Sequence, residues 1–415
     1  MTRSHSLKIS LLGPLSTVLP SPEQTQLLRA CLWSGEPGAQ AWREWSREIA
    51  DPAGFLRQEK DGVKGLLPLL FDSLQVYDVF VEGEFRTYLG TAYLRDELRS
   101  RTYGRISRDV ITALTSAGIP AILLKGAALA EICYKSPVLQ HAHYLDVLIR
   151  ARDLNRAVEV LRTHDFAGVS VAPGSEWRDV ELVHESGLPL VLHRRLFRFP
   201  FYSVNMEEFW ARSQTEMVYG APTRVLCSSD YLFHICGSVF DLERHESLRW
   251  VCDAWFLIQR FSNLDWNLLL ECACQSRMVF PLSITAGYLA KSLRAPIPAS
   301  FLLGLHAAAL KAQPIEREAA LFAVQTHARG GLKKIMQNCD DWPSRAFVLK
   351  WALLPSPNYM RCVYEIPSAF LLPLYYLYRP LRYLLRSVWF CGRRVLRRLG
   401  KRFESLRAAP KIISS

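Results

Sequence analysis

The chain has 415 residues and a formal net charge of +12; half of its residues are hydrophobic and 22% are charged. This balance excludes a disordered chain, and the length is sufficient for two or three domains. An integral membrane protein is excluded too, because no stretch approaches the ~18 to 20 uninterrupted apolar residues of a membrane span. The ten cysteines show no CxxC pair or zinc-finger spacing, which favours reduced thiols in a cytosolic protein.

The first 117 residues are predicted to form an N-terminal helical region, since apolar residues recur at helical spacing after a helix start at Ser21-Pro22-Glu23. Gly118-Ile119-Pro120 then marks a change of pattern. From residue 118 to 227 we expect a small α+β sheet domain. Its predicted elements are strands at Ala121–Leu124, His143–Ile149, Phe166–Val171, Asp179–Glu185 and Leu188–Arg195, and helices at Ala127–Tyr134 and Leu154–His164, the latter capped by Asp153.

Two further regions follow the sheet domain. Residues 228–360 are predicted to form a C-terminal helical domain, in which Asp253 is expected to pair with Arg249 one helical turn earlier. Residues 361–415 are predicted to form a basic amphipathic tail. Residues 379–415 hold eleven Lys and Arg and one Glu, so the rest of the chain has a net charge of only +2.

The segment Ile122–Leu148 carries the residues with the clearest chemistry. In a strand, residues two apart lie on one face, so Tyr144 and Asp146 project the same way. Carboxylates at both positions would hold a divalent cation against a triphosphate for in-line phosphoryl displacement. Lys125 and Gly126, at a helix N-terminus, would supply a cation and backbone N–H groups for phosphates. A strand-to-helix turn alone also accounts for the glycine.

Four separated motifs resemble the bacterial nucleotidyltransferase family of the polymerase-β-type superfamily. They read LLKGAALAEICY with LDVLIRARDLNRAVEVL, LPLVLHRRL, SDYLFHIC and LRWVCDAWFLI. The resemblance implies a small mixed-sheet nucleotidyltransferase-like domain flanked by helical regions. It also implies transfer of a nucleotidyl group from an NTP to an unknown acceptor, with Mg²⁺ or Mn²⁺ as cofactor. By this resemblance Asp146 is the catalytic carboxylate and metal ligand, while Lys125 and Gly126 bind the nucleotide.

The departures from the family pattern fall on positions that bind metal. The first strand carboxylate is replaced by Tyr144, the acid of a later strand by Val191 and a basic residue by Gln140, whereas Asp146 remains. A single carboxylate is a poor magnesium site, so standard two-metal transfer is predicted to be impaired. Whether the chain is an enzyme stays open. The alternative is a catalytically inactive binding or accessory protein of the same fold, associated with a membrane surface.

Replacements for the missing ligands also stay open. A softer site for zinc or manganese would use His141, His143, Asp146 and His193. Strand alternation argues against it, because it places His143 on the face opposite Asp146. Glu181 or Glu185 on the predicted hairpin would be another source of a second acid. Without such a replacement, Tyr144 and His193 are expected to support Asp146.

The tail carries a candidate interaction surface. Its cationic stretch begins at Arg379 and continues with Arg382, Arg386, Arg393, Arg394, Arg397 and Arg398. On a helical projection these lie mostly opposite Leu, Val and Trp side chains, which is typical of an interfacial helix on anionic lipid. A helix packed on the protein body stays open, and nucleic acid is the least favoured partner. We expect a cytoplasmic protein, either free or peripheral at the inner face of the membrane.

Overall fold

The computed structural model of the chain describes residues 12–58, 62–77, 79, 83–141, 144–168, 179–199, 201–241, 248–327, 336–337, 339, 342–364, 366 and 368–381. The chain divides into two compact units, Met1–Asp340 and Asp341–Ser415. The domain boundaries predicted after residues 117, 227 and 360 do not coincide with this division and stay predictions.

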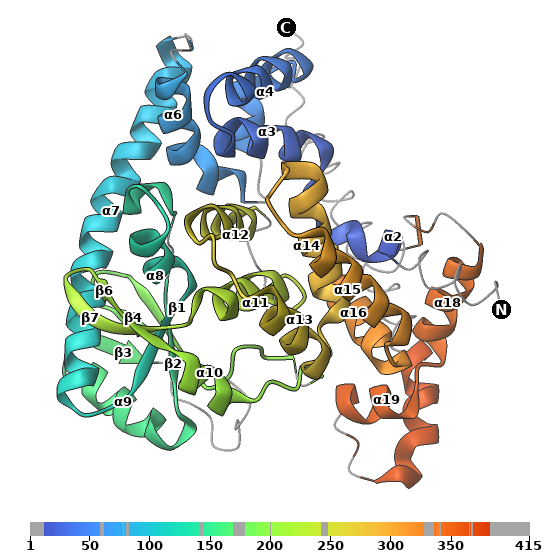
Figure 1. Cartoon of the computed structure of the whole chain (residues 1–415). Coiled ribbons are helices and arrows are strands. Elements are labelled where there is room, and N and C mark those ends of the chain that lie inside the picture. Colours follow the sequence, from blue (N-terminus) through green and yellow to red (C-terminus); the bar gives the residue numbers. More distant parts are fainter. Residues whose placement is uncertain are drawn as a thin grey trace, which may run out of the picture. The chain divides into compact units, whose positions relative to one another are not determined.

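A seven-stranded sheet forms the framework of the first unit (Figure 1). Its strands are β1 Ala121–Leu124, β2 Leu145–Ile149, β3 Phe166–Gly168, β4 Val180–His184, β5 Pro189–His193, β6 Gln214–Val218 and β7 Ala221–Val225. The spatial order is β3-β4-β5-β2-β1-β7-β6. The pairs β2/β5 and β1/β7 are parallel, and the other pairs are antiparallel. The predicted α+β class with a mixed sheet is therefore confirmed.

The β6–β7 hairpin was not predicted from the sequence. Four of the five residues of β6 are exposed, so the strand lacks the alternation of apolar and polar residues that marks a half-buried strand. Its turn consists of Tyr219 and Gly220, whose φ angles of 51° and 76° lie in the left-handed region. Positive φ at both central residues is what a two-residue hairpin turn favours.

Helices pack beside the sheet in the same unit. The longest is α7, Gly83–Ser116, which runs along the sheet and contacts β1, β7 and α9 (Figure 1). Two shorter helices connect strands, α8 Lys125–Ile132 after β1 and α9 Leu154–Arg162 after β2. Asp153 occupies the N-cap position of α9, but its side chain makes no capping hydrogen bond. The predicted N-cap position of Asp153 is therefore confirmed, whereas a capping hydrogen bond from its side chain is not found.

The helices that precede α7 agree with the expected helical region. They are α2 Leu12–Leu15, α3 Pro22–Leu32, α4 Gly35–Glu48, α5 Pro52–Gln58 and α6 Leu67–Val76. Ser21 caps α3 by accepting a hydrogen bond from the Gln24 backbone, while the Gln24 side chain accepts one from the Ser21 backbone. This reciprocal pair explains why the chain turns helical at the predicted position.

One helix, α10 Met206–Arg212, lies between β5 and β6 in the chain, and further helices follow β7. The latter are α11 Ser228–Ser238, α12 Arg249–Arg260, α13 Trp266–Gln275, α14 Val279–Leu293, α15 Ala299–Lys311 and α16 Pro314–His327. Every residue of α11 after Ser228 is buried, as expected for a helix enclosed by its neighbours. α11 contacts α12, α13 and α14.

The second unit consists of helices in its described part. These are α18 Trp342–Leu353, α19 Pro357–Tyr364, the 3₁₀ turn Ala369–Leu371 and the helical residues 372–381. None of the described helices of either unit is both long and apolar enough to cross a membrane. The six tail arginines from Arg382 to Arg398 lie outside the described residues.

Candidate functional site

A pocket in the first unit brings together residues from β2, α8, α11 and α12. It encloses about 460 Å³ including its open mouth. The lining residues are Lys125, Gly126, Tyr144, Asp146, Ile235, Ser238, Arg249, Trp250 and Asp253. The four residues singled out in the segment Ile122–Leu148 thus share one cavity. Tyr144 and Asp146 both face it, one immediately before β2 and the other within β2.

Lys125 begins α8 directly after β1 and has a strained backbone. Its φ is 38°, a left-handed value that L-residues other than glycine rarely adopt. Leu124, at the N-cap, makes no side-chain hydrogen bond to the first turn of α8. Among the described residues, the Lys125 ammonium has no hydrogen bond or ion pair. A fixed backbone therefore directs an unpaired cation to the pocket.

Gly126 permits a close approach. A Cβ added at this position would lie 3.2 Å from Nε2 of Gln140 and 3.4 Å from its Oε1. Because a larger residue would press on Gln140, the glycine is explained by packing as well as by ligand binding. The Oε1 atom of Gln140 is buried and has no hydrogen-bond partner among the described residues.

On the sheet side of the pocket, Asp146 is the end of a buried chain of charges. Its Oδ1 lies 2.7 Å from Nε2 of His193, and Nδ1 of His193 lies 2.9 Å from Oδ2 of Asp179. Arg198 donates to the same Asp179 oxygen. Burial alone would lower the pKa of His193, but the two carboxylates outweigh it and raise the pKa to about 10. His193 is therefore an imidazolium at neutral pH.

Asp179 and Arg198 are the members of this chain of charges that the sequence did not predict. Burial would raise the pKa of Asp179, but His193 and Arg198 hold it below its usual value. The residue precedes Val180, which pairs with Leu192 in the β4–β5 hairpin. The next position of that register sets Asp179 opposite His193. The register of the predicted hairpin would therefore have identified Asp179 as a neighbour of His193.

The other acids proposed as replacements lie at different places. Val191 pairs with Asp146 on one side and with Glu181 on the other, so exposed Glu181 is separated from Asp146 by the whole of β5. Glu185 follows β4, and its backbone N–H donates to the Asp165 carbonyl. Neither residue lines the pocket.

The histidine-rich metal site also finds little support. His141 Nδ1 lies 2.7 Å from Asp96 Oδ2 on α7, and both ring nitrogens of His193 already face carboxylates. His143 lies outside the described residues. In the described part of the chain, no group of three or more His, Cys, Asp or Glu residues is arranged to hold a metal ion.

On the helix side of the pocket, buried Asp253 has neutral partners. Its Oδ1 accepts hydrogen bonds from the Tyr134 hydroxyl at 2.7 Å and from Gln140 Nε2 at 3.4 Å. Burial raises the pKa of Asp253, although Tyr134 and the nearby charge of Arg249 oppose the shift. The predicted direct pair of Asp253 with Arg249 is therefore wrong, because the two side chains interact by a longer-range charge interaction and not by a hydrogen bond.

Arg249 instead reaches across to the strand that precedes Asp146. Its Nη1 donates to the His141 carbonyl at 2.7 Å, and its Nη2 donates to the Tyr144 hydroxyl at 3.2 Å. The guanidinium carbon lies 5.4 Å from the centre of the Tyr144 ring, within cation–π range. The position expected to carry a carboxylate therefore holds a guanidinium in place.

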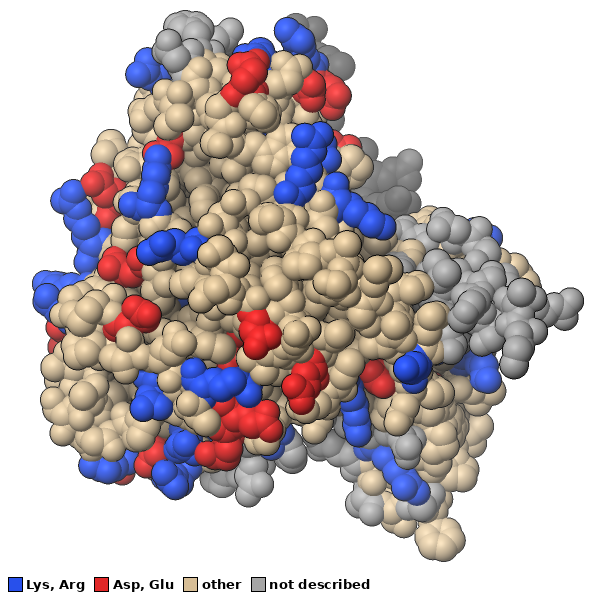
Figure 2. All heavy atoms as spheres, in the orientation of Figure 1, with Lys and Arg blue, Asp and Glu red and all other residues tan. Residues whose placement is uncertain are grey.

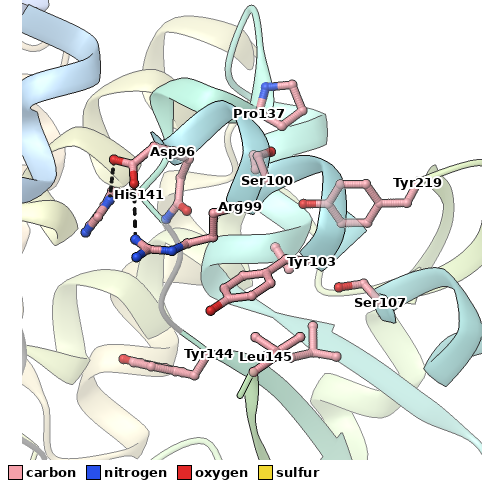
Figure 3. A pocket seen from close by; sticks show the side chains of 14 residues that line it. Asp96, Arg99, Ser100, Tyr103, Ser107, Pro137, His141, Tyr144, Leu145 and Tyr219 are labelled. Carbon is pink, nitrogen blue, oxygen red and sulfur yellow. Dashed lines mark hydrogen bonds and ion pairs between the residues drawn. The ribbon is translucent and has the colours of Figure 1, made fainter. Parts of the chain in front are cut away.

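A second cavity, of about 400 Å³ when the solvent at its mouth is included, adjoins the first. Figure 3 shows Tyr103 and Tyr219 lining it, with Asp96 bonded to both His141 and Arg99. The two cavities share Tyr144. Tyr219 approaches α7 so closely that a Cβ on Gly104 would lie 2.7 Å from its ring, so glycine is needed at this helical position.

The chain belongs to the family described as an uncharacterised nucleotidyltransferase, which matches residues 62–293, more than half of the chain. The sequence-based family assignment is confirmed at this level. No curated protein matches the chain.

One similar solved structure is that of an antigenic nucleotidyltransferase-like protein from Paracoccidioides brasiliensis. The sequence identity is 16% and the TM-score is 0.30, over 48% of this chain and 95% of that one. A likeness this low carries no argument about the site.

Proposed function

We propose that the protein binds the phosphates of a nucleoside triphosphate in the pocket beside Asp146, and that cationic side chains rather than two metal ions neutralise them. One observation carries the proposal: Tyr144, at a position where the family resemblance implies a carboxylate, is bonded to the guanidinium of Arg249. A cation thus occupies the side of the pocket where two carboxylates would have held a metal ion. We also propose, from the family resemblance, that the metal site is degenerate and that the protein is bacterial.

Lys125 supports the same interpretation. It lines the pocket with Arg249, and the two cations face anionic side chains that already have internal partners. Asp146 is bonded to an imidazolium and Asp253 to a phenol. Phosphate oxygens would therefore meet positive charge, and charge-assisted hydrogen bonds to phosphate are about twice as strong as neutral ones.

A pair of magnesium ions does not fit the residues present. Mg²⁺ requires hard oxygen ligands in near-octahedral geometry, usually from more than one carboxylate. Val191, next to Asp146 in the sheet, offers no oxygen, and Tyr144 stays neutral at pH 7. Asp146 shares one oxygen with His193. We therefore derive no transfer step through bound metal.

A second candidate is a residual nucleotidyltransferase with an unknown acceptor. One observation favours it: Asp146 lines the pocket, and its Oδ2 has no hydrogen-bond partner among the described residues. Such an enzyme would depend on Asp146 and on Mg²⁺ or Mn²⁺. The two candidates differ in what metal removal does.

Calorimetric titration of the full chain with ATP, in Mg²⁺ and in EDTA, separates them. We expect binding to persist in EDTA and to weaken about tenfold in Lys125→Gln, because one charge-assisted contact is lost. Lys291→Gln is the matched control, since Lys291 is exposed on α14 and outside the pocket. Asp146→Asn is expected to leave ATP affinity within about threefold, a free-energy change well under 1 kcal/mol.

Metal-dependent binding that Asp146→Asn abolishes would contradict the proposal and support the enzyme. Equal loss in Lys125→Gln and Lys291→Gln would show that only net charge matters. The double variant Tyr144→Asp, Val191→Glu provides a check of the assigned geometry, because restoring two acids beside Asp146 should make nucleotide binding respond to Mn²⁺.

A further inference from the structure

The second unit exposes an apolar stripe on helical residues 372–381 and the turn before them. Phe370 is 94% exposed, Leu374 61%, Leu377 72% and Leu381 52%. Spacings of three and four residues place these side chains on one face of a helix. A continuous row of exposed large hydrophobic residues marks an interaction surface rather than an ordinary solvated helix.

The opposite face of this helix fixes its orientation. Arg379, which the sequence assigned to the cationic surface, is only 1% exposed. Its guanidinium donates to the Ala352 carbonyl at 2.9 Å and lies 5.1 Å from the ring centre of Tyr359. The Tyr376 hydroxyl donates to the Pro355 carbonyl at 2.6 Å. Because these contacts hold the helix by its inner face, the apolar stripe cannot turn inward without breaking them.

The second unit also exposes other apolar and basic side chains. In the second unit, α18 exposes Trp342 at 75%, and Leu354 just after it is 63% exposed. The described residues of this unit include Arg345, Lys350 and Arg361, all exposed, and no Asp or Glu. In Figure 2 Lys and Arg alternate with Asp and Glu over the first unit. Over the whole sequence of the second unit, fourteen Lys and Arg stand against three acids, Asp341, Glu365 and Glu404.

The sequence directly after Leu381 adds more positive charge. Residues 382–415 contain ten Lys and Arg and a single Glu. Six of these are the tail arginines, from Arg382 to Arg398, that the sequence assigns to a membrane surface or acidic partner. Apolar side chains joined to a large cationic excess match the boundary between the acyl chains and the headgroups of anionic lipids.

We propose that the second unit docks on the surface of a bilayer that contains anionic phospholipids, with Phe370, Leu374, Leu377 and Leu381 inserted at the acyl boundary. The cationic residues that follow Leu381 in the sequence suit the headgroup region rather than the hydrocarbon core, so the proposal places this segment on the membrane surface. A second copy of the chain fits the stripe less well, because two strongly cationic surfaces repel each other.

Co-sedimentation of the full chain with vesicles tests the docking surface. We expect binding to phosphatidylcholine vesicles that contain phosphatidylserine, and weak binding to phosphatidylcholine alone. Leu374→Ser combined with Leu377→Ser should lower the partition coefficient at least about tenfold, because two inserted side chains are lost. Leu94→Ser with Leu98→Ser is the matched control, since Leu94 and Leu98 are 60% and 66% exposed on α7 of the first unit.

Equal binding by the stripe variant and the parent chain would overturn the proposal, as would equal binding to the two vesicle types. A dimer in lipid-free sedimentation equilibrium that the stripe variant dissociates would assign the stripe to a second copy and overturn it as well. The inference is independent of the nucleotide pocket: Lys125→Gln should leave vesicle binding unchanged.

Discussion

On the sheet side of the pocket Asp146 is bonded to an imidazolium, whereas on the helix side Asp253 is bonded to a phenol and an amide. Both carboxylates are buried. The first belongs to a chain of alternating charges that continues through Asp179 to Arg198. The second has neutral donors and feels the cations of the pocket only at a distance.

The difference shows two ways in which a buried acid can be kept without a metal ion. An ion pair fixes the charge of Asp146 but makes it depend on His193, because an unpaired buried charge is costly. Asp253 has only neutral hydrogen-bond donors and no bonded counter-ion, and burial raises its pKa. Each side of the pocket thus supplies its own compensation, and the ammonium of Lys125, which has no bonded partner in the described part of the chain, is available to a ligand.

The largest effect is expected from breaking the sheet side. His193→Leu removes the cation shared by Asp146 and Asp179, and we expect it to lower the free energy of unfolding by about 3–5 kcal/mol. Urea denaturation followed by tryptophan fluorescence measures the loss. His184→Leu on β4 is the control, because the hydrogen bonds of the His184 ring among the described residues are to nearby Ser186 and not to a carboxylate. A loss below about 1 kcal/mol in His193→Leu would show that the charge chain is not structural.

A smaller effect is expected on the helix side. Tyr134→Phe keeps the ring contact with Phe256 but removes the hydroxyl that donates to Asp253, at a cost of about 1–3 kcal/mol. The comparison is Tyr231→Phe, which removes a hydroxyl bonded to the Leu123 carbonyl. In urea denaturation, Tyr134→Phe should lower the free energy of unfolding by more than Tyr231→Phe does. Equal losses would argue that Asp253 is no stronger an acceptor than a neutral carbonyl.

The smallest effect is expected from Asp253→Asn, which keeps an acceptor for Tyr134 and removes the charge. At pH 7 its stability should lie within about 1 kcal/mol of the parent chain. The pKa of Asp253 is raised from its usual 3.8 by burial, so its contribution to stability is complete below that value and is lost as pH rises through the folded pKa. Denaturation at several pH values should show that the free energy of unfolding of the variant rises relative to that of the parent above about pH 4.

A gap between the two chains that stays constant from pH 3.5 to 7 would mean that Asp253 titrates as in the unfolded chain. The charges of Arg249 and Lys125 act on Asp253 from the other side. Variants of these two residues would widen the pH range over which the gap develops, because they now oppose the shift.

The local part of the site could be predicted from the sequence. Lys125, Gly126 and Asp146 are placed by strand and helix patterns within about 25 residues, and the pocket contains all three. The helical regions before and after the sheet in the sequence, and five of its strands, were also predicted, because their apolar periodicity is strong. The β6–β7 hairpin was missed because its outer strand is polar and exposed.

The long-range contacts could not be predicted. The bond between Arg249 and Tyr144 joins residues 105 positions apart, and the bond between Tyr134 and Asp253 joins residues 119 apart. Such pairs depend on how α12 packs against α8, which no local pattern specifies. The sequence instead suggested a pair one helical turn apart for Asp253, the simplest partner that periodicity can offer.

The left-handed backbone of Lys125 lowers the stability of the fold, whereas its side chain favours the binding of an anion. A lysine at a φ of 38° costs about 1–2 kcal/mol relative to glycine, which adopts such angles freely. On stability alone, this strand-to-helix junction would contain two glycines in succession. A glycine there would, however, remove the ammonium from the mouth of the pocket. The residue with the strained backbone thus also gives the pocket an ammonium that has no bonded partner among the described residues.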